Sequence, residues 1–282
     1  MWTVVSADSR RSDMFGTRLI SGIVLIVALI AIFVFGDPYL TIAFGLLSVC
    51  AVYELMRVLK LDKHIYCAMA MTATVILYVL IWFGLLAWSI CLLTVFTILL
   101  LIVYVLSYPK IRIEAVCEAL FATIYAGGLL SYVVFIRNLW QGEWLIWLVV
   151  MGSWGADTCA YCVGKLIGKH HFSELSPKKT IEGCVGGVLG AGLIAFGYSF
   201  FAPDMEWFLF SPKLVFPLVV MVAAVVSIFG DLAASAIKRN FEVKDYGRII
   251  PGHGGILDRF DSMIFVAPFV YYLLIVSSTI SA

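Results

Sequence analysis

Long apolar segments separated by short polar ones form the main pattern of this chain. A helix of roughly 20 apolar residues can cross about 30 Å of hydrocarbon. Nine segments of this kind occur, at residues 17–35, 38–59, 65–83, 85–107, 116–136, 143–163, 184–202, 212–237 and 261–280. The boundary between the third and fourth segments is the weakest, because Trp82, Phe83 and Gly84 are the only interruption. The pattern predicts an all-α polytopic membrane protein with about nine transmembrane helices.

The composition excludes a soluble globular domain. Hydrophobic residues make up 63% of the 282 positions and charged residues only 13%, whereas soluble domains are roughly half apolar. The first apolar segment is followed by further spans and not by a small-residue cleavage site, so we interpret it as a helix and not as a signal peptide. The net charge of +1 says little about partners, and we expect membrane lipids and no nucleic acid among them.

The positions of the basic residues predict the orientation in the membrane. If the N-terminus is cytoplasmic, seventeen of the nineteen Lys and Arg residues fall on the cytoplasmic side, and only Arg137 and Lys213 fall outside. Such a bias is the positive-inside pattern of membrane proteins. We therefore expect a multi-pass protein of the cell (inner) membrane whose charged loops face the cytoplasm. With nine spans the C-terminus would lie outside.

Polarity divides the chain into two halves of one integral membrane domain, residues 1–282. Residues 17–140 are mostly uninterrupted apolar helix, which suits a scaffold, and residues 141–282 carry the charged loops of a candidate active site on the cytoplasmic face. Glu54 lies one turn before Arg57 at the cytoplasmic end of the second span. An interfacial ion pair at i,i+3 is one interpretation of Glu54, and a supporting role behind the active site is the other.

Three carboxylates flank the most charged loop of the chain, between the eighth and ninth spans. Asp231, Ser235 and Lys238 have the spacing i, i+4, i+7, so a helix that continues out of the eighth span would place them on one face. Asp258 and Asp261 share a face at the start of the ninth span. Charged groups at membrane depth are costly unless they face a polar cavity or a partner. Clustered carboxylates are the ligands that Mg²⁺ requires, so the sequence predicts a metal site here.

Basic side chains near these carboxylates could neutralise phosphate groups. They are Lys238, Arg239, Lys244, Arg248 and Arg259 in the same segment, and Lys178 and Lys179 in an earlier turn-rich loop. Carboxylates for Mg²⁺ beside cations for phosphate form the working set of phosphoryl or nucleotidyl transfer. We expect the 173–182 loop to fold toward residues 230–261, although an ordinary positive-inside loop is the alternative.

The sequence allows two interpretations for each of two further residues, His253 and Asp157. His253 lies in a glycine-rich turn, residues 251–255, and could contact a phosphate or only cap the turn. Asp157 lies near the end of a span without an adjacent basic residue. It therefore needs a partner elsewhere in the fold, either in the active site or as a buried structural carboxylate.

Five motifs resemble the signature of the phosphatidate cytidylyltransferase (CDP-diacylglycerol synthase) family. They are Asp157-Thr-x-Ala-Tyr-x-x-Gly164, Leu175-Ser-Pro-Lys-Lys-Thr-Ile-Glu-Gly183, Ser235-Ala-Ile-Lys-Arg239, Lys244-Asp245 and Pro251-Gly-His-Gly-Gly-Ile-Leu-Asp-Arg-Phe-Asp261. The match is dense over roughly residues 150–265, and such a long signature is specific. One departure is Ala234, where members of this family often carry Glu before the signature serine. If that Glu orients a metal or a lysine, turnover is altered in this chain.

The resemblance implies an enzyme that converts CTP and phosphatidic acid into CDP-diacylglycerol and diphosphate in phospholipid biosynthesis. It implies Mg²⁺ as cofactor, allows K⁺ as a second ion, and leaves a homodimer open. On this interpretation the catalytic residues are Asp231, Asp258, Asp261 and Lys179, and the three aspartates hold the metal. The substrate-binding residues are Asp157, Lys178, Lys179, Ser235, Lys238, Arg239, Lys244, Asp245, His253 and Arg259.

Three other functions are alternatives to this one. A related CTP-dependent cytidylyltransferase or kinase acting on an isoprenoid lipid could share the nucleotide site. A cation-coupled transporter would use Asp157 and Asp231 near the bilayer midplane and would show inverted repeats, which the sequence lacks. A purely structural membrane protein gives no reason for clustered carboxylates.

Overall fold

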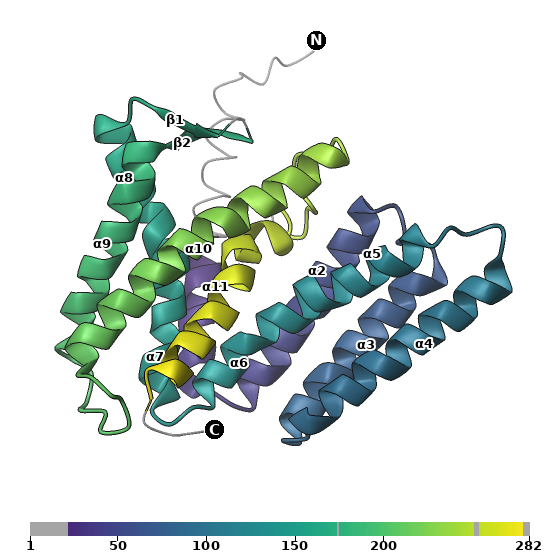
Figure 1. The fold of residues 1–282 in the computed structure, drawn as a ribbon, viewed down its shortest axis with the longest axis horizontal. Coiled ribbons are helices and arrows are strands. Elements are labelled where there is room, and N and C mark those ends of the chain that lie inside the picture. The colour runs from purple at the N-terminus through teal and green to yellow at the C-terminus, as the bar shows by residue number, and fades with distance from the viewer. Residues whose placement is uncertain (1–21, 174, 251–253, 279–282) are drawn as a thin grey trace, which may run out of the picture.

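The chain forms a bundle of long apolar helices with one small β-hairpin at one end (Figure 1). This computed structural model describes residues 22–173, 175–250 and 254–278. Within them, eight helices are long and apolar enough to cross a membrane. The protein is therefore an all-α polytopic membrane protein, with the hairpin as an addition that the helical pattern did not predict.

The helices and strands follow the predicted spans closely. The helix Gly22–Phe35 comes first, followed by α2 Tyr39–Val58, α3 Ile65–Trp82, α4 Ser89–Ser107, α5 Glu114–Ala122, α6 Tyr132–Arg137, α7 Gly142–Val150, α8 Ala156–Ile167, β1 His171–Ser173, β2 Ser176–Thr180, α9 Ile181–Ser199, α10 Pro212–Asn240 and α11 Leu257–Val276. The part of the first predicted span before residue 22 lies outside the described residues. The weak boundary near residue 84 is confirmed, because α3 ends at Trp82 and Gly84 has a positive φ of 67°.

Two of the spans contain a short π-helical segment. The segment Thr123–Gly128 follows α5 and leads toward α6. The segment Met151–Gly155 connects α7 directly to α8. A π segment changes the face that the following residues present, and such segments are frequent at functional sites. The second one comes directly before Asp157. Its Gly152 packs closely on α10, where a Cβ would meet the Ala223 methyl at 2.7 Å.

Glycines allow α8 and α9 to approach each other closely. A Cβ at Gly186 would lie 2.5 Å from the Val163 side chain, and one at Gly187 would lie 2.8 Å from the Ala160 methyl. Small residues at this spacing favour tight helix packing in membranes. The close contact fixes the position of the hairpin that connects the two helices.

The segment before α9 is a hairpin and not the irregular loop that the sequence suggested. β1 and β2 pair antiparallel, with His171 opposite Thr180 and Ser173 opposite Ser176. The hydroxyl oxygen of Thr180 then accepts a hydrogen bond from the Gly183 N–H at 3.1 Å and caps α9. Such a short hairpin lacks the alternating apolar pattern by which longer strands are recognised, so hydrophobic periodicity could not predict it.

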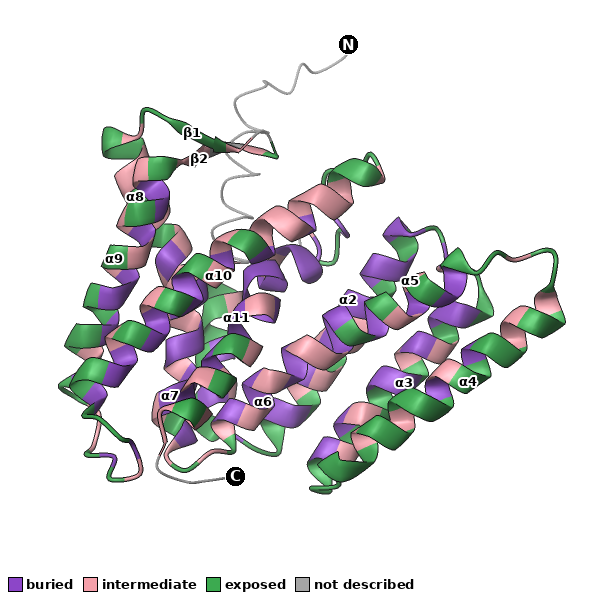
Figure 2. Cartoon of the chain, in the orientation of Figure 1, coloured by how far each residue is buried: buried purple, intermediate pink, exposed green. Residues whose placement is uncertain are grey.

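Burial is concentrated where α11 meets its neighbours, which include α10, α7, α6 and α2 (Figure 2). The first turns of α11 are almost completely buried, Asp258 and Asp261 included. By contrast, α4 buries only Phe96 and Leu100. The hairpin, the end of α10 and the start of α11 lie at one end of the bundle, opposite the C-terminus (Figure 1).

Candidate active site

A cleft of about 670 Å³ opens at the hairpin end of the bundle. It is lined by parts of the helix Gly22–Phe35, α8, β2, α9, α10 and α11. The polar side chains in its lining are Asp157, Thr158, Tyr161, Lys165, Ser176, Lys179, Thr180, Asp231, Asp258, Arg259 and Asp261. Six of the predicted site residues therefore border one cavity: Asp157, Lys179, Asp231, Asp258, Arg259 and Asp261.

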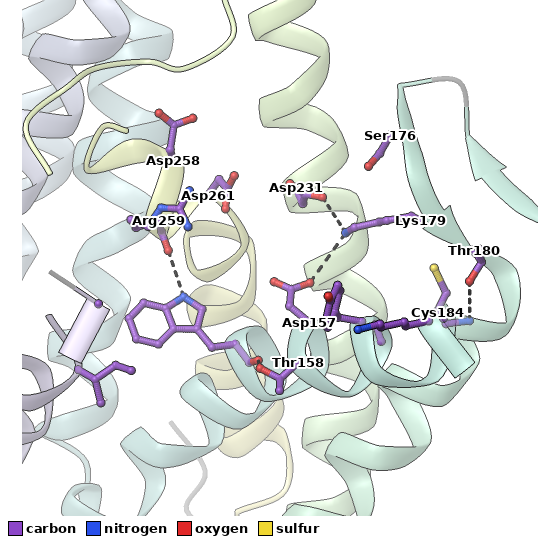
Figure 3. A pocket seen from close by; sticks show the side chains of 18 of the residues that line it. Asp157, Thr158, Ser176, Lys179, Thr180, Cys184, Asp231, Asp258, Arg259 and Asp261 are labelled. Carbon is purple, nitrogen blue, oxygen red and sulfur yellow. Dashed lines mark hydrogen bonds and ion pairs between the residues drawn. The ribbon is translucent and has the colours of Figure 1, made fainter. Parts of the chain in front are cut away.

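Lys179 extends from β2 toward two carboxylates on different helices (Figure 3). Its Nζ lies 2.7 Å from Asp231 Oδ2 and 3.9 Å from Asp157 Oδ1. This contact confirms the prediction that the 173–182 segment folds toward residues 230–261. Asp157 thus has the partner from another part of the fold that its sequence context required.

Asp261 lies beside this ion-pair group on α11 (Figure 3). Its Oδ1 accepts a hydrogen bond from the backbone N–H of Ser262 at 2.8 Å, and the Ser262 hydroxyl donates to Asp157 Oδ2 at 3.3 Å. Asp157, Asp231 and Asp261 therefore face the same cleft from α8, α10 and α11. Like charges gathered in this way need a cation for stability, and Lys179 supplies one.

Arg259 borders the same cleft from the first turn of α11. Its backbone carbonyl accepts a hydrogen bond from the indole N–H of Trp154 at 3.0 Å, which ties α11 to the π segment before α8. Its Nε is buried and has no hydrogen-bond partner among the described residues. A buried donor without a partner costs about 1–3 kcal/mol, so an anion bound in the cleft would satisfy this guanidinium.

Asp258 has a different set of partners from the other carboxylates. Its Oδ1 accepts from Lys238 Nζ at 2.8 Å, and its Oδ2 accepts from the backbone N–H groups of Tyr246 at 2.8 Å and Gly255 at 3.0 Å. The Tyr246 hydroxyl donates to the carbonyl of Ala234 at 2.9 Å. Burial raises the pKa of Tyr246, so this phenol stays protonated as a donor. Asp258 therefore fastens the α10–α11 loop, and a metal bound to Asp258 would have to share or replace these bonds.

Glu54 reaches this loop from α2. Its side chain is buried, with 2% of the residue exposed, and its Oε2 accepts from the backbone N–H of Leu257 at 2.9 Å. Gly247 and Gly255 lie so close to the Glu54 carboxylate that neither position has room for a Cβ. Of the two interpretations of Glu54, the geometry favours the supporting role, because the carboxylate holds the first turn of α11 in place.

Several predicted residues do not border the cleft. Among the described residues Ser235, Lys238, Arg239, Lys244 and Asp245 are absent from its lining, and Lys238 is instead paired with Asp258. His253 and the side chain of Lys178 lie outside the described residues. Ser235 and Lys238 do share the helix α10 with Asp231, as the spacing predicts.

The sequence did not single out other residues that line the cleft. Trp154, Thr158, Tyr161, Lys165, Ser176, Thr180 and Cys184 are among them. Thr158 and Tyr161 follow Asp157 in the same motif, so helical spacing from Asp157 was the available signal. Ser176 and Thr180 flank the predicted lysines in the second motif, but no role was assigned to them. The hairpin brings them to the cleft together with Lys179.

The chemistry of the cleft suits a hard divalent cation. No group of three or more His, Cys, Asp or Glu side chains in the described parts of the chain is arranged to hold a metal by itself. Mg²⁺ does not need such a cage, because it is usually bound by one or two carboxylates together with substrate phosphates. Asp231 and Asp261 provide two carboxylates at the cleft, and the Lys179 ammonium shows that a positive charge is already accommodated beside Asp231.

Comparison with known proteins gives consistent matches over most of the chain. The sequence profile described as the cytidylyltransferase family matches residues 16–277. A phosphatidate cytidylyltransferase of Bacillus subtilis (strain 168) is 34% identical over 270 residues, which cover 91% of this chain and 96% of that protein. A phosphatidate cytidylyltransferase of Synechocystis is 34% identical over 200 residues, 61% of this chain and 67% of that protein. One from Staphylococcus haemolyticus is 39% identical over 175 residues, 61% and 64% of the two chains.

Proposed function

Because this chain belongs to the cytidylyltransferase family, we propose that it transfers the cytidylyl group of CTP to phosphatidate. The products are CDP-diacylglycerol and diphosphate. The proposal is supported by a relative named phosphatidate cytidylyltransferase whose match covers 91% of this chain. It is also supported by the chemistry of the cleft, since both substrates are phosphate esters.

The observation that carries the proposal is the pairing of opposite charges around one cavity. Lys179 and Arg259 face it together with Asp157, Asp231 and Asp261, and Arg259 keeps a buried N–H without a partner in the described residues. Two anionic substrates repel each other unless cations lie between them. Catalysis of phosphoryl-type transfer consists mostly of positioning and charge stabilisation, which this set of side chains can provide.

In the proposed reaction an oxygen of the phosphatidate phosphate attacks the α-phosphorus of CTP. The new bond joins that oxygen to the α-phosphorus, and the bond from the α-phosphorus to the bridging oxygen of diphosphate breaks. The electron pair leaves with diphosphate, so no redox partner is needed. Lys179 and Arg259 stabilise the negative charge that builds on the phosphate oxygens, since cations placed in advance cost no reorganisation.

We further propose that Asp231 and Asp261 hold Mg²⁺, and that Asp157 and Lys179 balance the charge around it. When bound, Mg²⁺ neutralises the diphosphate leaving group. The sequence prediction also placed Asp258 at the metal. The three hydrogen bonds of Asp258 support a role in shaping the loop beside the metal. A second ion such as K⁺ and a homodimer stay predictions to which we assign no residues.

The proposed location is the cell (inner) membrane, with the cleft on the cytoplasmic face. The loops that carry the predicted cytoplasmic Lys and Arg residues, including the α2–α3 and α4–α5 loops, lie at the same end as the hairpin (Figure 1). A cleft at the ends of the helices can receive CTP from water and a lipid head group from the bilayer. The one-sided position of the cleft also supports an enzyme over a transporter with a midplane site.

The test is a two-substrate assay with purified protein. Labelled CTP is incubated with Mg²⁺ and either phosphatidate, an isoprenoid phosphate, an isoprenoid alcohol or no lipid. We expect a labelled lipid product and diphosphate only with phosphatidate. Label transfer to an isoprenoid phosphate alone, or transfer of the γ-phosphate of CTP to the alcohol, would assign the chain to the related enzyme class instead.

A further inference from the structure

A second cavity, which we call the apolar groove, lies beside the active-site cleft. It has a volume of about 730 Å³ and runs between the helix Gly22–Phe35, α2 and the start of α11. No side chain in its described lining is charged, and Cys50 is the most polar one. Leu29 and Phe260 form a buried floor with 5% and 2% exposure, whereas Val24 and Leu46 form a rim with 60% and 63% exposure. The groove is therefore open along one side to the surroundings of the helices, which are lipid in a membrane.

The two helices that form the long walls of the groove run antiparallel, and the stretches that line it have similar lengths. The helix Gly22–Phe35 turns at residues 36–38 into α2, and Phe33 stacks on Phe44 with ring centroids 6.0 Å apart near this turn. The lining extends from Val24 to Ile32 on the first helix and from Ala43 to Cys50 on α2. At 1.5 Å per residue each stretch is roughly 10 Å long. The groove is thus an elongated channel that runs from the active-site end of the helices toward their middle.

The groove and the cleft meet at two points. Leu25 lines both cavities. Phe260 lines the groove, while its sequence neighbours Arg259 and Asp261 line the cleft. A molecule that spans the junction would therefore place a charged group near Arg259 and an apolar chain along Leu25 and Phe260.

We propose that the apolar groove binds an acyl chain of the lipid substrate while the phosphate of that lipid lies in the cleft. This proposal rests on the proposed function for the identity of the head group. The groove matches an acyl chain in chemistry and in shape, because it is narrow, has no charged side chain in its described lining and is open to the bilayer. It begins beside Arg259, whose buried Nε has no hydrogen-bond partner among the described residues and could bind the lipid phosphate. Apolar burial stabilises the bound chain in proportion to the apolar area removed from water. Chain length beyond the junction consequently contributes to affinity.

A variant that fills the deep end of the groove tests the proposal. Ala43→Phe places a ring near the turn, far from the cleft, and Ala68→Phe adds the same ring on an exposed face of α3 as a matched control. We expect Ala43→Phe to raise the KM for dioleoyl phosphatidate about tenfold, as a mismatch of a few methylenes in an apolar site does. Its KM for dihexanoyl phosphatidate, its KM for CTP and its kcat should stay within about twofold of the unaltered protein.

Equal effects on long-chain and short-chain phosphatidate, or no effect on either, would overturn the groove as the acyl site. Thermal unfolding in detergent checks that both variants fold. A direct measurement on the unaltered protein serves if Ala43→Phe does not fold. Phosphatidate with a photoactivatable diazirine at the end of one acyl chain is irradiated with the protein, and labelled peptides are identified by mass spectrometry.

We expect label in residues 24–32 and 43–50, which competing unlabelled phosphatidate removes. A phosphatidylcholine probe of the same length should label these residues weakly. Equal labelling by both probes would show that the groove holds only bulk bilayer lipid, and label confined to α3 and α4 would place the acyl chain elsewhere. If the unaltered protein forms no CDP-diacylglycerol, the proposed function fails, and the labelling pattern alone then decides whether the groove selects an anionic lipid.

Discussion

The Lys179 ammonium lies 2.7 Å from the Asp231 carboxylate, and the two residues come from a β-hairpin and from the longest helix of the bundle. The same Nζ lies 3.9 Å from Asp157 on α8. This ion-pair group joins three separate parts of the chain at the cleft. The hairpin therefore borders the candidate active site and is not merely a connection between α8 and α9.

Lys179→Ala should lower kcat and kcat/KM by about 100-fold, the scale seen when one preorganised charge-stabilising group is removed. The reason is that Lys179 pairs with Asp231 and Asp157 and, on the proposed function, also neutralises a substrate phosphate. Steady-state kinetics with CTP and phosphatidate check this. Lys169→Ala, an exposed lysine before the hairpin, is the control and should leave both constants nearly unchanged. If Lys179→Ala had wild-type kinetics, the charge of Lys179 would not act in catalysis. The hairpin would then serve only as a positively charged segment that orients the protein in the membrane.

Asp231→Asn and Asp261→Asn should each lower turnover severely while the protein remains folded. Both changes remove a negative charge from the proposed Mg²⁺ site without changing side-chain size. The losses should be strongly non-additive in the double variant, as for residues that act as one unit. Turnover as a function of Mg²⁺ concentration is measured together with thermal unfolding. Asp204→Asn at the opposite end of the bundle serves as the control; a loss of less than about threefold in Asp231→Asn would remove Asp231 from the site.

Asp258 and Lys238 form a buried pair, so breaking the pair should destabilise the protein. The loss of one partner of a buried pair costs about 3–5 kcal/mol, and the side chains of Lys238 and Asp258 are only 14% and 2% exposed. We expect Asp258→Asn and Lys238→Met each to lower the Tm, and the double variant to lose less than the sum. Thermal unfolding of the three variants measures this coupling. Strict additivity would show that the pair contributes no mutual stabilisation.

Glu54→Ala should lower kcat although Glu54 does not line the cleft. It leaves the buried N–H of Leu257 without its acceptor, at a cost of about 1–3 kcal/mol, and frees the first turn of α11. Glu54→Gln retains an acceptor oxygen and should recover most of the activity. The KM values for CTP and phosphatidate are measured as well. Unchanged KM values beside a lower kcat would indicate a positioning role of Glu54 and not a general loss of the fold. Equal kcat values for the Ala and Gln variants at equal Tm would contradict a role through the Leu257 hydrogen bond.

The proposed orientation predicts which thiols are reachable from outside the cell. In a background without the seven native cysteines, a cysteine at Trp140 should react with a membrane-impermeant reagent in intact cells. One at His171 in the hairpin should react only after the membrane is opened. Both side chains are exposed, so access to reagent and not burial decides the outcome. The reverse pattern would place the cleft on the side away from cytosolic CTP.

Span positions could be predicted well because length and hydropathy decide them. The predicted segments 38–59 and 65–83 correspond to Tyr39–Val58 and Ile65–Trp82. The final span was predicted to begin at residue 261, but α11 begins at Leu257. The charged residues Asp258 and Arg259 hid this first turn from a hydropathy argument. Asp258 is buried and Arg259 half-buried, because other segments pack against them.

The charged residues of the site could be identified by type, but their partners could not. Asp157 needed a cation, and the sequence could not show that Lys179 supplies it, because the pairing depends on how the hairpin folds over α8 and α10. Asp258 and Asp261 look equivalent as carboxylates one turn apart. Only the positions of Tyr246, Gly255 and Lys238 show that Asp258 fastens a loop while Asp261 faces the other carboxylates.

The length of α10 determines the depth of Asp231, and so of the proposed reaction, relative to the membrane surface. Its 29 residues extend roughly 43 Å at 1.5 Å per residue, and the stretch from Pro212 to Asp231 spans roughly 28 Å, close to the thickness of the hydrocarbon layer. Asp231 therefore reaches the plane of the lipid head groups when the apolar part of α10 fills the bilayer. The lipid substrate can then react without being lifted out of its leaflet, and the product can return by sideways diffusion. Turnover of such an enzyme follows the mole fraction of substrate in the membrane surface and not its bulk concentration.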